Sequence, residues 1–128
     1  DEALAAGAKE CKKSLRSFSD LTFDVVVDFA GTETTIRDAV SAVRPGGIVV
    51  LVGLASQSFE LPTTDLVTKN VSLKGSTSAS IQELQEVFEL LASGALNPQI
   101  QHIPFHDVPK ALEMLGESEV NGRLYTTP

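Results

Sequence analysis

The fold of this chain is predicted from three short segments: FDVVVDFAG (Phe23–Gly31), GIVVLVG (Gly47–Gly53) and NVSLKG (Asn70–Gly75). Each segment is a run rich in aliphatic residues that stops at a glycine. The runs VVV and IVVLV are continuous rather than alternating, which is typical of parallel strands buried on both faces. The three segments therefore predict strands of a parallel sheet.

The stretch between the first two strands, Thr32–Arg44, predicts a helix. Its apolar residues recur at helical spacing: Ile36, Ala39, Val40 and Val43. A strand, a helix and a second strand of these lengths form a parallel crossover unit. The predicted class is therefore α/β with a mainly parallel sheet.

The glycines that end the three strands predict where a ligand would bind. Parallel strands bring their carboxyl ends to one edge of a sheet, so we expect Gly31, Gly53 and Gly75 to lie side by side. Open α/β sheets bind ligands at that edge, where a missing side chain lets a ligand approach the backbone. The alternative is that each glycine only turns the chain out of its strand.

Further elements are predicted along the rest of the chain. They are a short strand (Glu10–Leu15), a brief edge strand (Phe59–Leu61), a short helix (Thr63–Lys69), two amphipathic helices (Ile81–Ser93 and Val108–Leu115) and a final strand (Arg123–Thr126). Ser80 and Glu83 have the spacing of a capping box at a helix start. The sequence RPGG, residues 44–47, predicts a tight helix-to-strand turn, with the next strand beginning at Ile48.

Composition limits the classes of protein and partner. At 128 residues the chain has the length of one domain, so residues 1–128 are expected to form a single one. The net charge of −7 argues against a nucleic-acid partner, and no apolar window reaches the ~18 residues of a membrane span. Cys11 is the one cysteine, so no internal disulfide can form and a reducing, cytoplasmic location fits best. With His102 and His106 it supplies too few ligands for a closed zinc site.

Candidate binding residues follow each strand. We call the residues that directly follow the carboxyl end of a strand its exit. The candidates are Phe29, Ala30 and Gly31 at the first exit, Val52, Gly53 and Leu54 at the second, and Ser76, Thr77 and Ser78 at the third. Asp28 would accept a hydrogen bond from a ligand hydroxyl, or instead cap the next helix or bind loop amides. Arg123 would reach a phosphate or stand solvated at the surface. No catalytic set, P-loop or Gly-x-Gly-x-x-Gly is present, so the residues alone indicate a nucleotide- or cofactor-binding domain.

The order of several motifs resembles a known family. They are FDVVVDFAG, RPGGIVVLVGL, ELP, NVSLKGS, SIQELQEVFELLASG, HDVPKALEML and GRLYTTP. Together they make the chain similar to the C-terminal part of the cofactor domain of medium-chain dehydrogenases/reductases, most like the zinc-type alcohol dehydrogenases. The resemblance implies part of a Rossmann-like, doubly wound sheet. It also implies an oxidoreductase that transfers hydride between NAD or NADP and an alcohol or carbonyl substrate.

The resemblance also assigns roles by position. Backbone groups at Val52, Ser76 and Ser78 would hold the nicotinamide carboxamide, beside Gly53 and Leu54. Residues Phe29, Ala30 and Gly31 would flank the adenosine half, and Arg123 would contact the pyrophosphate. A homo-oligomer would form through Phe59–Leu61, or through the strand at 23–29 if it lies exposed at a sheet edge.

The family pattern is incomplete in this sequence. The fingerprint glycines, the acidic residue that binds the ribose and any zinc ligands belong to parts that precede the matched segments. We therefore expect a fragment that is inactive alone, and the choice between NAD and NADP stays open. Two alternatives are a class I methyltransferase, in which FDVVV and RPGGIVVLVG are also familiar, and a non-enzymatic oligomerising module.

Overall fold

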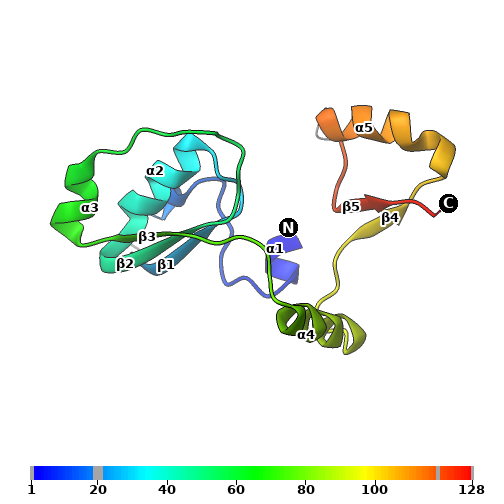
Figure 1. Ribbon diagram of the computed structural model, residues 1–128, viewed down its shortest axis with the longest axis horizontal. Helices are drawn as coiled ribbons and strands as arrows, with labels where there is room; N and C mark the ends of the chain where they lie inside the picture. The colour runs from blue at the N-terminus through cyan, green and yellow to red at the C-terminus, as the bar shows by residue number, and fades with distance from the viewer. Residues whose placement is uncertain (1, 19–21, 118, 128) are drawn as a thin grey trace. The chain divides into compact units, whose positions relative to one another are not determined.

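The computed structural model describes residues 2–18, 22–117 and 119–127 of the chain. Figure 1 shows the elements in chain order. They are α1 (Glu2–Ala5), η1 (Leu15–Ser17), β1 (Phe23–Asp28), α2 (Glu33–Ala42), β2 (Val43–Leu51), α3 (Thr63–Lys69), β3 (Ser72–Gly75), α4 (Ile81–Ala92), β4 (Ile100–His102), η2 (Phe105–Asp107), α5 (Val108–Gly116) and β5 (Arg123–Tyr125). Contacts divide the chain into two compact units, Asp1–Ser78 and Ala79–Pro128, which are described separately.

A parallel sheet of three strands forms the first unit, in the order β1-β2-β3. In its register Val26 lies beside Val49, and Leu51 lies between Asp28 and Gly75. The strand carboxyl ends therefore reach the same edge of the sheet. This arrangement confirms the predicted α/β class and the parallel direction of the three glycine-ended strands. Burial on both faces is wrong for β1, because it lies at the edge of the sheet with Val25 and Val27 exposed.

The start of β2 differs from the prediction. The strand begins at Val43 rather than Ile48, and Val43 pairs with Phe23 before the register shifts to Val25 beside Ile48. The RPGG sequence therefore forms a bulge within the strand. Gly46 has a φ of +74°, a left-handed conformation that glycine adopts without steric cost. Pairing through Val43 keeps the chain in the sheet on both sides of this bulge.

A small aliphatic core holds α2 against the sheet. Ala39 and Val40 of α2 are fully buried beside Val43 and Val49 of β2. Partly buried side chains surround them: Leu15, Val26, Leu51, Leu61, Leu66, Val71 and Leu73. The helix contacts β1 and β2, and α3 contacts β2 and α2. Burying one face of a sheet beneath amphipathic helices is the main source of stability in such a layer.

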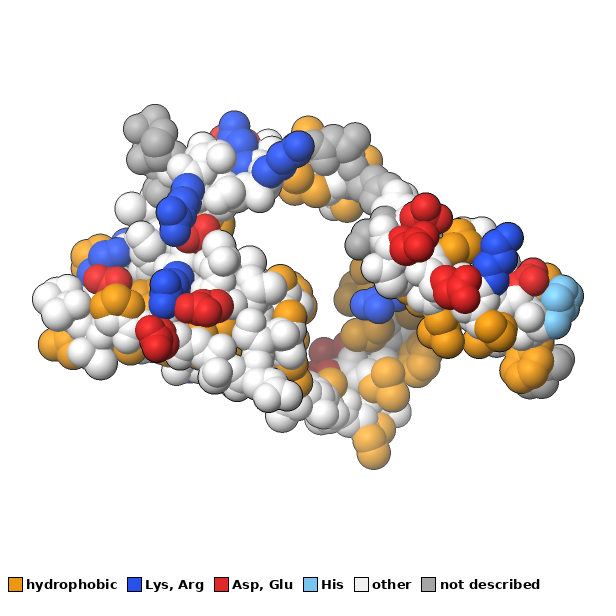
Figure 2. Space-filling view, turned by 90° about the horizontal axis from the view of Figure 1, so that it is seen from above, with side chains coloured by type: hydrophobic (Ala, Val, Ile, Leu, Met, Phe, Trp, Pro, Cys, Tyr) orange, Lys and Arg blue, Asp and Glu red, His pale blue; other side chains and the backbone are white. Residues whose placement is uncertain are grey.

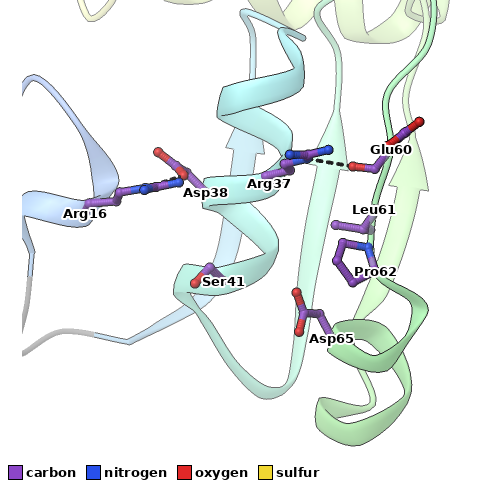
Figure 3. Close-up of a pocket in the computed structure, with 8 residues that line it drawn as sticks. All are labelled: Arg16, Arg37, Asp38, Ser41, Glu60, Leu61, Pro62 and Asp65. Carbon is purple, nitrogen blue, oxygen red and sulfur yellow. Dashed lines mark hydrogen bonds and ion pairs between the residues drawn. The ribbon is translucent and has the colours of Figure 1, made fainter.

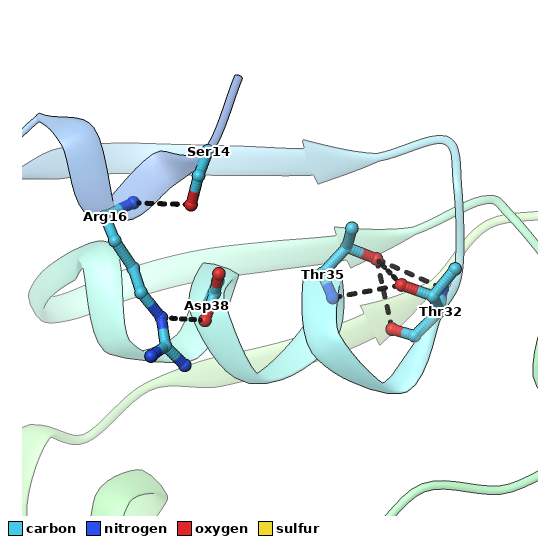
Figure 4. A network of polar contacts seen from close by, with 5 residues as sticks. All are labelled: Ser14, Arg16, Thr32, Thr35 and Asp38. Atoms are coloured by element: carbon cyan, nitrogen blue, oxygen red, sulfur yellow. Dashed lines mark hydrogen bonds and ion pairs between the residues drawn. The ribbon is translucent and has the colours of Figure 1, made fainter. Parts of the chain in front are cut away.

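Two polar contacts fix the position of α2, as Figure 4 shows. Thr32 and Thr35 form a reciprocal capping box, in which each backbone N–H donates to the other hydroxyl at 3.1 Å. One turn further along, Asp38 accepts from Arg16 Nε at 2.7 Å. Thr32 therefore starts the helix as predicted, and Arg16 attaches the N-terminal segment to it.

Two predicted edge strands are wrong. Residues 10–15 form no strand; instead, the Ser14 hydroxyl accepts from the Arg16 N–H and starts the short 3-10 turn η1. Phe59–Leu61 is also irregular, and the Glu60 carbonyl accepts from Arg37 Nε at 2.7 Å. A strand needs a neighbour for its backbone groups, and the described residues provide none for either segment. By contrast, β1 does lie at a sheet edge, as the resemblance implied.

The second unit contains α4 and a separate pair of parallel strands, β4 and β5, joined through η2 and α5. The register places Ile100 beside Arg123. Ser80 and Glu83 form the predicted capping box of α4, and Pro109 lies in the first turn of α5.

In the part of the chain that the structure describes, no helix is long and apolar enough to cross a membrane. Figure 2 shows acidic and basic side chains lying among one another on one face.

The capping box of α4 gives a prediction about pH. The Ser80 N–H donates to Glu83 Oε2 at 2.7 Å, and this bond, with a smaller effect of the Ser80 hydroxyl, lowers the pKa of Glu83. A carboxylate whose pKa falls on folding stabilises the helix above its unfolded pKa and loses that effect as pH drops through the folded pKa. We expect Ser80→Ala to raise the Glu83 pKa part of the way to its ordinary value, as measured by NMR titration. Ser93→Ala, at the other end of α4, is the control, and an unchanged Glu83 pKa in Ser80→Ala would contradict the assignment.

Candidate functional site

A cavity of about 500 Å³ lies at the carboxyl edge of the three-stranded sheet. The residues that line it are Gly31, Ile36, Leu51, Val52, Gly53, Leu54, Ser56, Gln57, Phe59, Gly75, Ser76, Thr77 and Ser78. The three glycines that end the strands therefore meet at one cavity, as the sequence predicted. None of the lining side chains is ionisable, so the cavity offers apolar surface, hydroxyls, one amide and backbone groups.

Hydrogen bonds between strand exits determine which backbone groups face this cavity. The N–H groups of Val52 and Gly53 both donate to the Asp28 carbonyl, at 2.9 and 3.0 Å. The Ser76 N–H donates to the Leu51 carbonyl at 2.9 Å. Among the described residues, no hydrogen bond is seen to the carbonyls of Val52 and Ser76 or from the Ser78 N–H. These three positions thus offer two acceptors and one donor, and the Gly53 carbonyl and the Leu54 N–H are likewise seen without a partner among the described residues.

Asp28 fixes the conformation of the first exit, the turn after β1. Its carboxylate is buried, with 6% of the residue exposed, and its Oδ1 accepts from the N–H groups of Ala30 and Gly31 at 2.9 and 3.0 Å. Its Oδ2 accepts from the Thr35 hydroxyl at 2.8 Å. Of the three roles considered for Asp28, the structure therefore shows the binding of loop amides. These bonds order the turn that leads into α2.

Direct contact between the first two exits explains two of the glycines. Gly31 has a φ of +66°, and a Cβ at this position would overlap the Gly53 carbonyl. A Cβ on Gly53 would in turn overlap the Ala30 carbonyl carbon and crowd Gly31 N. These glycines are therefore required by the packing of one exit against the other. Gly31 has the left-handed conformation of a turn, whereas no positive φ is found at Gly53, and both residues line the cavity.

Ser56 fixes the loop that borders the cavity. Its N–H donates to the Gly31 carbonyl at 2.9 Å, and its hydroxyl accepts from the Glu33 N–H at 3.2 Å. Leu54, two residues before, is 91% exposed. On the opposite side, Ser78 has a φ of +54°, a conformation that non-glycine residues rarely adopt and that is common at binding sites. Sequence patterns gave no signal for Ser56 or for the left-handed conformation of Ser78, although Ser78 itself was a candidate binding residue.

Comparison with known proteins assigns the family. Residues 1–93 match the family model described as zinc-binding dehydrogenase. The chain belongs to this family. The dehydrogenase resemblance drawn from the motifs is thereby confirmed, and the class I methyltransferase alternative is set aside.

Individual relatives agree with this membership. D-arabinose 1-dehydrogenase (NADP(+)) of Saccharolobus solfataricus is 31% identical over 100% of this chain and 39% of its own length. Probable cinnamyl alcohol dehydrogenase 3 of Oryza sativa subsp. japonica is 31% identical over 96% of this chain and 32% of its own. The solved structure of acetophenone reductase from Geotrichum candidum, in complex with NAD, is 30% identical with a TM-score of 0.86, over 95% of this chain and 36% of that one. This dehydrogenase-family chain thus spans less than two fifths of each of these proteins.

The remaining candidate residues lie outside the cavity. Phe29, 76% exposed, and Ala30 occupy the turn after β1 but do not line the cavity. Arg123 is the exposed first residue of β5 in the second unit, and its N–H donates to the Gln99 carbonyl at 2.9 Å. The roles expected for these three residues stay predictions.

The family name refers to zinc, but the described residues offer no site for it. In residues 2–18, 22–117 and 119–127, no group of three or more His, Cys, Asp or Glu side chains is placed to hold a metal ion. Closed zinc sites need four such ligands and catalytic ones usually three. No step involving zinc is therefore assigned to these residues.

A larger cavity, about 880 Å³, lies beside α2 and α3 rather than at the strand ends. Figure 3 shows Arg16 paired with Asp38 and Arg37 bonded to the Glu60 carbonyl. Arg37 also pairs with Glu33 at 2.7 Å. Both arginines that line the cavity therefore already have partners, whereas no partner is seen for the carboxylates of Glu60 and Asp65 among the described residues. The cavity thus offers an anionic ligand no free cation among its lining residues. The cavity at the sheet edge is the better candidate.

The contact between the exits predicts the effect of adding one methyl group. Gly31→Ala places a Cβ against the Gly53 carbonyl at a positive φ, and we expect it to lower the free energy of unfolding by about 2 kcal/mol or more. Urea unfolding followed by circular dichroism measures this loss. Gly116→Ala is the control, because a Cβ at Gly116 meets nothing within 4 Å. Equal stability of the two variants would show that the exits separate easily.

Proposed function

We propose that this chain is the cofactor-binding part of an NAD(P)-dependent oxidoreductase that transfers hydride between nicotinamide and an alcohol or carbonyl substrate. The observation that carries the proposal is the cavity where three parallel strands of a zinc-binding dehydrogenase chain end. Open α/β sheets bind dinucleotides at this edge. The relatives support both nucleotides: the name of D-arabinose 1-dehydrogenase includes NADP(+), and the acetophenone reductase structure is a complex with NAD.

The free backbone groups suit a carboxamide. An amide NH2 donates two hydrogen bonds and its oxygen accepts one or two. In the proposed arrangement the carbonyls of Val52 and Ser76 accept from the nicotinamide amide, and the Ser78 N–H donates to its oxygen. The N–H groups of Val52 and Ser76 take no part, because they already donate within the protein.

The other candidate residues keep the roles that the resemblance gives them. Phe29, Ala30 and Gly31 would flank the adenosine half, and Arg123 would bind the pyrophosphate, since a guanidinium matches phosphate oxygens. Gly53 and Leu54 would border the nicotinamide side. Of these residues, only Gly31, Gly53 and Leu54 line the cavity.

The lining residues limit what this part of the protein can do. The bound nicotinamide supplies the hydride chemistry. The cavity residues orient the ring and exclude water from one side of it, but none has a side chain that exchanges a proton near neutral pH. We therefore propose that they position the ring and that the chain alone shows no turnover.

The carboxamide assignment predicts how the ligand can be changed. Replacing the amide of the nucleotide by a carboxylate, as in deamido-NAD, removes both donors and sets negative charge against two carbonyl oxygens. We expect deamido-NAD to bind at least about tenfold more weakly than NAD in isothermal titration calorimetry. The full-length protein is used, with S-adenosylmethionine as a control that should not bind. Absence of NAD and NADP binding would refute the proposed function and favour a non-enzymatic module.

We further propose a homo-oligomer formed through Phe59–Leu61 or the edge strand β1. Val25 and Val27 of β1 are 49% and 45% exposed, and an unpaired edge offers backbone groups to another chain. We expect a dimer in analytical ultracentrifugation. Val25→Lys should weaken it if β1 is the interface, and Glu60→Pro if the loop segment is. A parent protein that stays monomeric at all concentrations would refute both interfaces.

A cytoplasmic location is proposed from the single cysteine. Cys11 is exposed and unpaired with any other cysteine, which suits a reducing compartment. Fractionation of cells that express the full-length protein tests this location.

A further inference from the structure

The three glycines that meet at the cavity differ in what a side chain would encounter. Gly31 and Gly53 cannot accept a Cβ because each lies against the backbone of the other exit. A Cβ at Gly75 meets nothing within 4 Å, and its φ lies outside the left-handed range. Packing and backbone conformation therefore require the first two glycines but not Gly75.

The position of Gly75 in the sheet makes its missing side chain unusual. Side chains alternate along a strand, so residue 75 lies on the same face as Leu73, which packs against the buried core. Leu51, beside Gly75 in the register, packs against that core as well. An inward position at the end of such a strand normally carries an apolar side chain. Glycine there leaves the space open and costs conformational entropy.

Gly75 is also adjacent to the backbone groups proposed to bind the carboxamide. It directly precedes Ser76, and its partner Leu51 directly precedes Val52. Gly75 lines the same cavity as Val52 and Ser76, and a Cβ at residue 75 would meet only open space there. The open space is therefore next to the acceptors of the proposed site.

We propose that Gly75 is a specificity-determining residue, whose missing side chain reserves the space that the flat nicotinamide ring occupies. The inference rests on the proposed function and deepens it. Gly31 and Gly53 preserve the fold, whereas Gly75 sets the size of the group that can enter. Enlarging residue 75 excludes the ring without disturbing the strand exits.

The experiment compares Gly75→Ala and Gly75→Val with the parent in the full-length protein. The probes are NAD or NADP, whichever the parent binds, and the corresponding ADP-ribose, which lacks the nicotinamide ring. We expect the valine variant to bind the dinucleotide about ten- to a hundredfold more weakly, and the alanine variant to fall between valine and parent. ADP-ribose affinity and the melting temperature should not fall in either variant. This pattern separates loss of ring space from loss of folding.

Each other outcome has a defined meaning. Equal dinucleotide affinity in the valine variant and the parent would overturn the role of Gly75 while leaving the proposed function intact. Equal weakening of dinucleotide and ADP-ribose would also overturn it, because the effect would not concern the ring. If the parent binds neither probe, the proposed function fails first. If the valine variant has a lower melting temperature than the parent, the dinucleotide and ADP-ribose affinities of the alanine variant decide instead, because a Cβ alone at residue 75 has open space.

Discussion

The contact between the backbones of two strand exits is the constraint on which the candidate site depends. Gly31 and Gly53 approach so closely that neither tolerates a Cβ. This approach lets the Asp28 carbonyl accept two N–H groups from the second exit. These hydrogen bonds determine which backbone N–H and C=O groups at the strand exits keep no partner within the protein and so remain for a ligand.

The rest of the first unit holds that contact in place. The Asp28 carboxylate binds the turn amides and the Thr35 hydroxyl, so the turn, the capping box and the start of α2 form one polar network. Beneath it, Ala39 and Val40 bury the helix against the sheet. Ser56 then ties the loop after β2 to both Gly31 and Glu33. The cavity therefore has one side made by the strand exits and another made by the loop after β2, in which Leu54 is exposed.

Much of this fold was predictable from local pattern. Continuous runs such as VVV identified strands of the parallel sheet, but the burial on both faces that they predicted is wrong for the edge strand β1. Thr32, Ser80 and Glu83 marked helix starts correctly, because capping depends on neighbours in the sequence. The wrong predictions concern segments whose structure depends on a neighbouring strand. Residues 10–15 and 59–61 have the composition of strands, but strand formation depends on a neighbour that local sequence does not reveal. The extension of β2 back to Val43 was missed for a related reason, since a bulge forms only where the adjacent strand continues the pairing.

The same contrast between local sequence and distant neighbours applies to the candidate site. The meeting of three glycines at one edge followed from parallel strands, but the sequence gave no way to tell that two serve packing and one faces open space. That distinction depends on distances between segments more than twenty residues apart. The backbone of Ser78 and the role of Ser56 also depend on the folded shape of loops. Arg123 lies in the second unit, and its predicted phosphate contact has no counterpart in the described cavity.

The acceptors and donor proposed to bind the carboxamide belong to the main chain, and this has an evolutionary consequence. Mutations at positions 52, 76 and 78 exchange side chains but leave carbonyl and amide groups in place, provided that the strand exits keep their course. Recognition of an invariant ligand group can then persist while the neighbouring side chains diversify toward different substrates. A search for the site by residue identity would overlook what the peptide groups preserve.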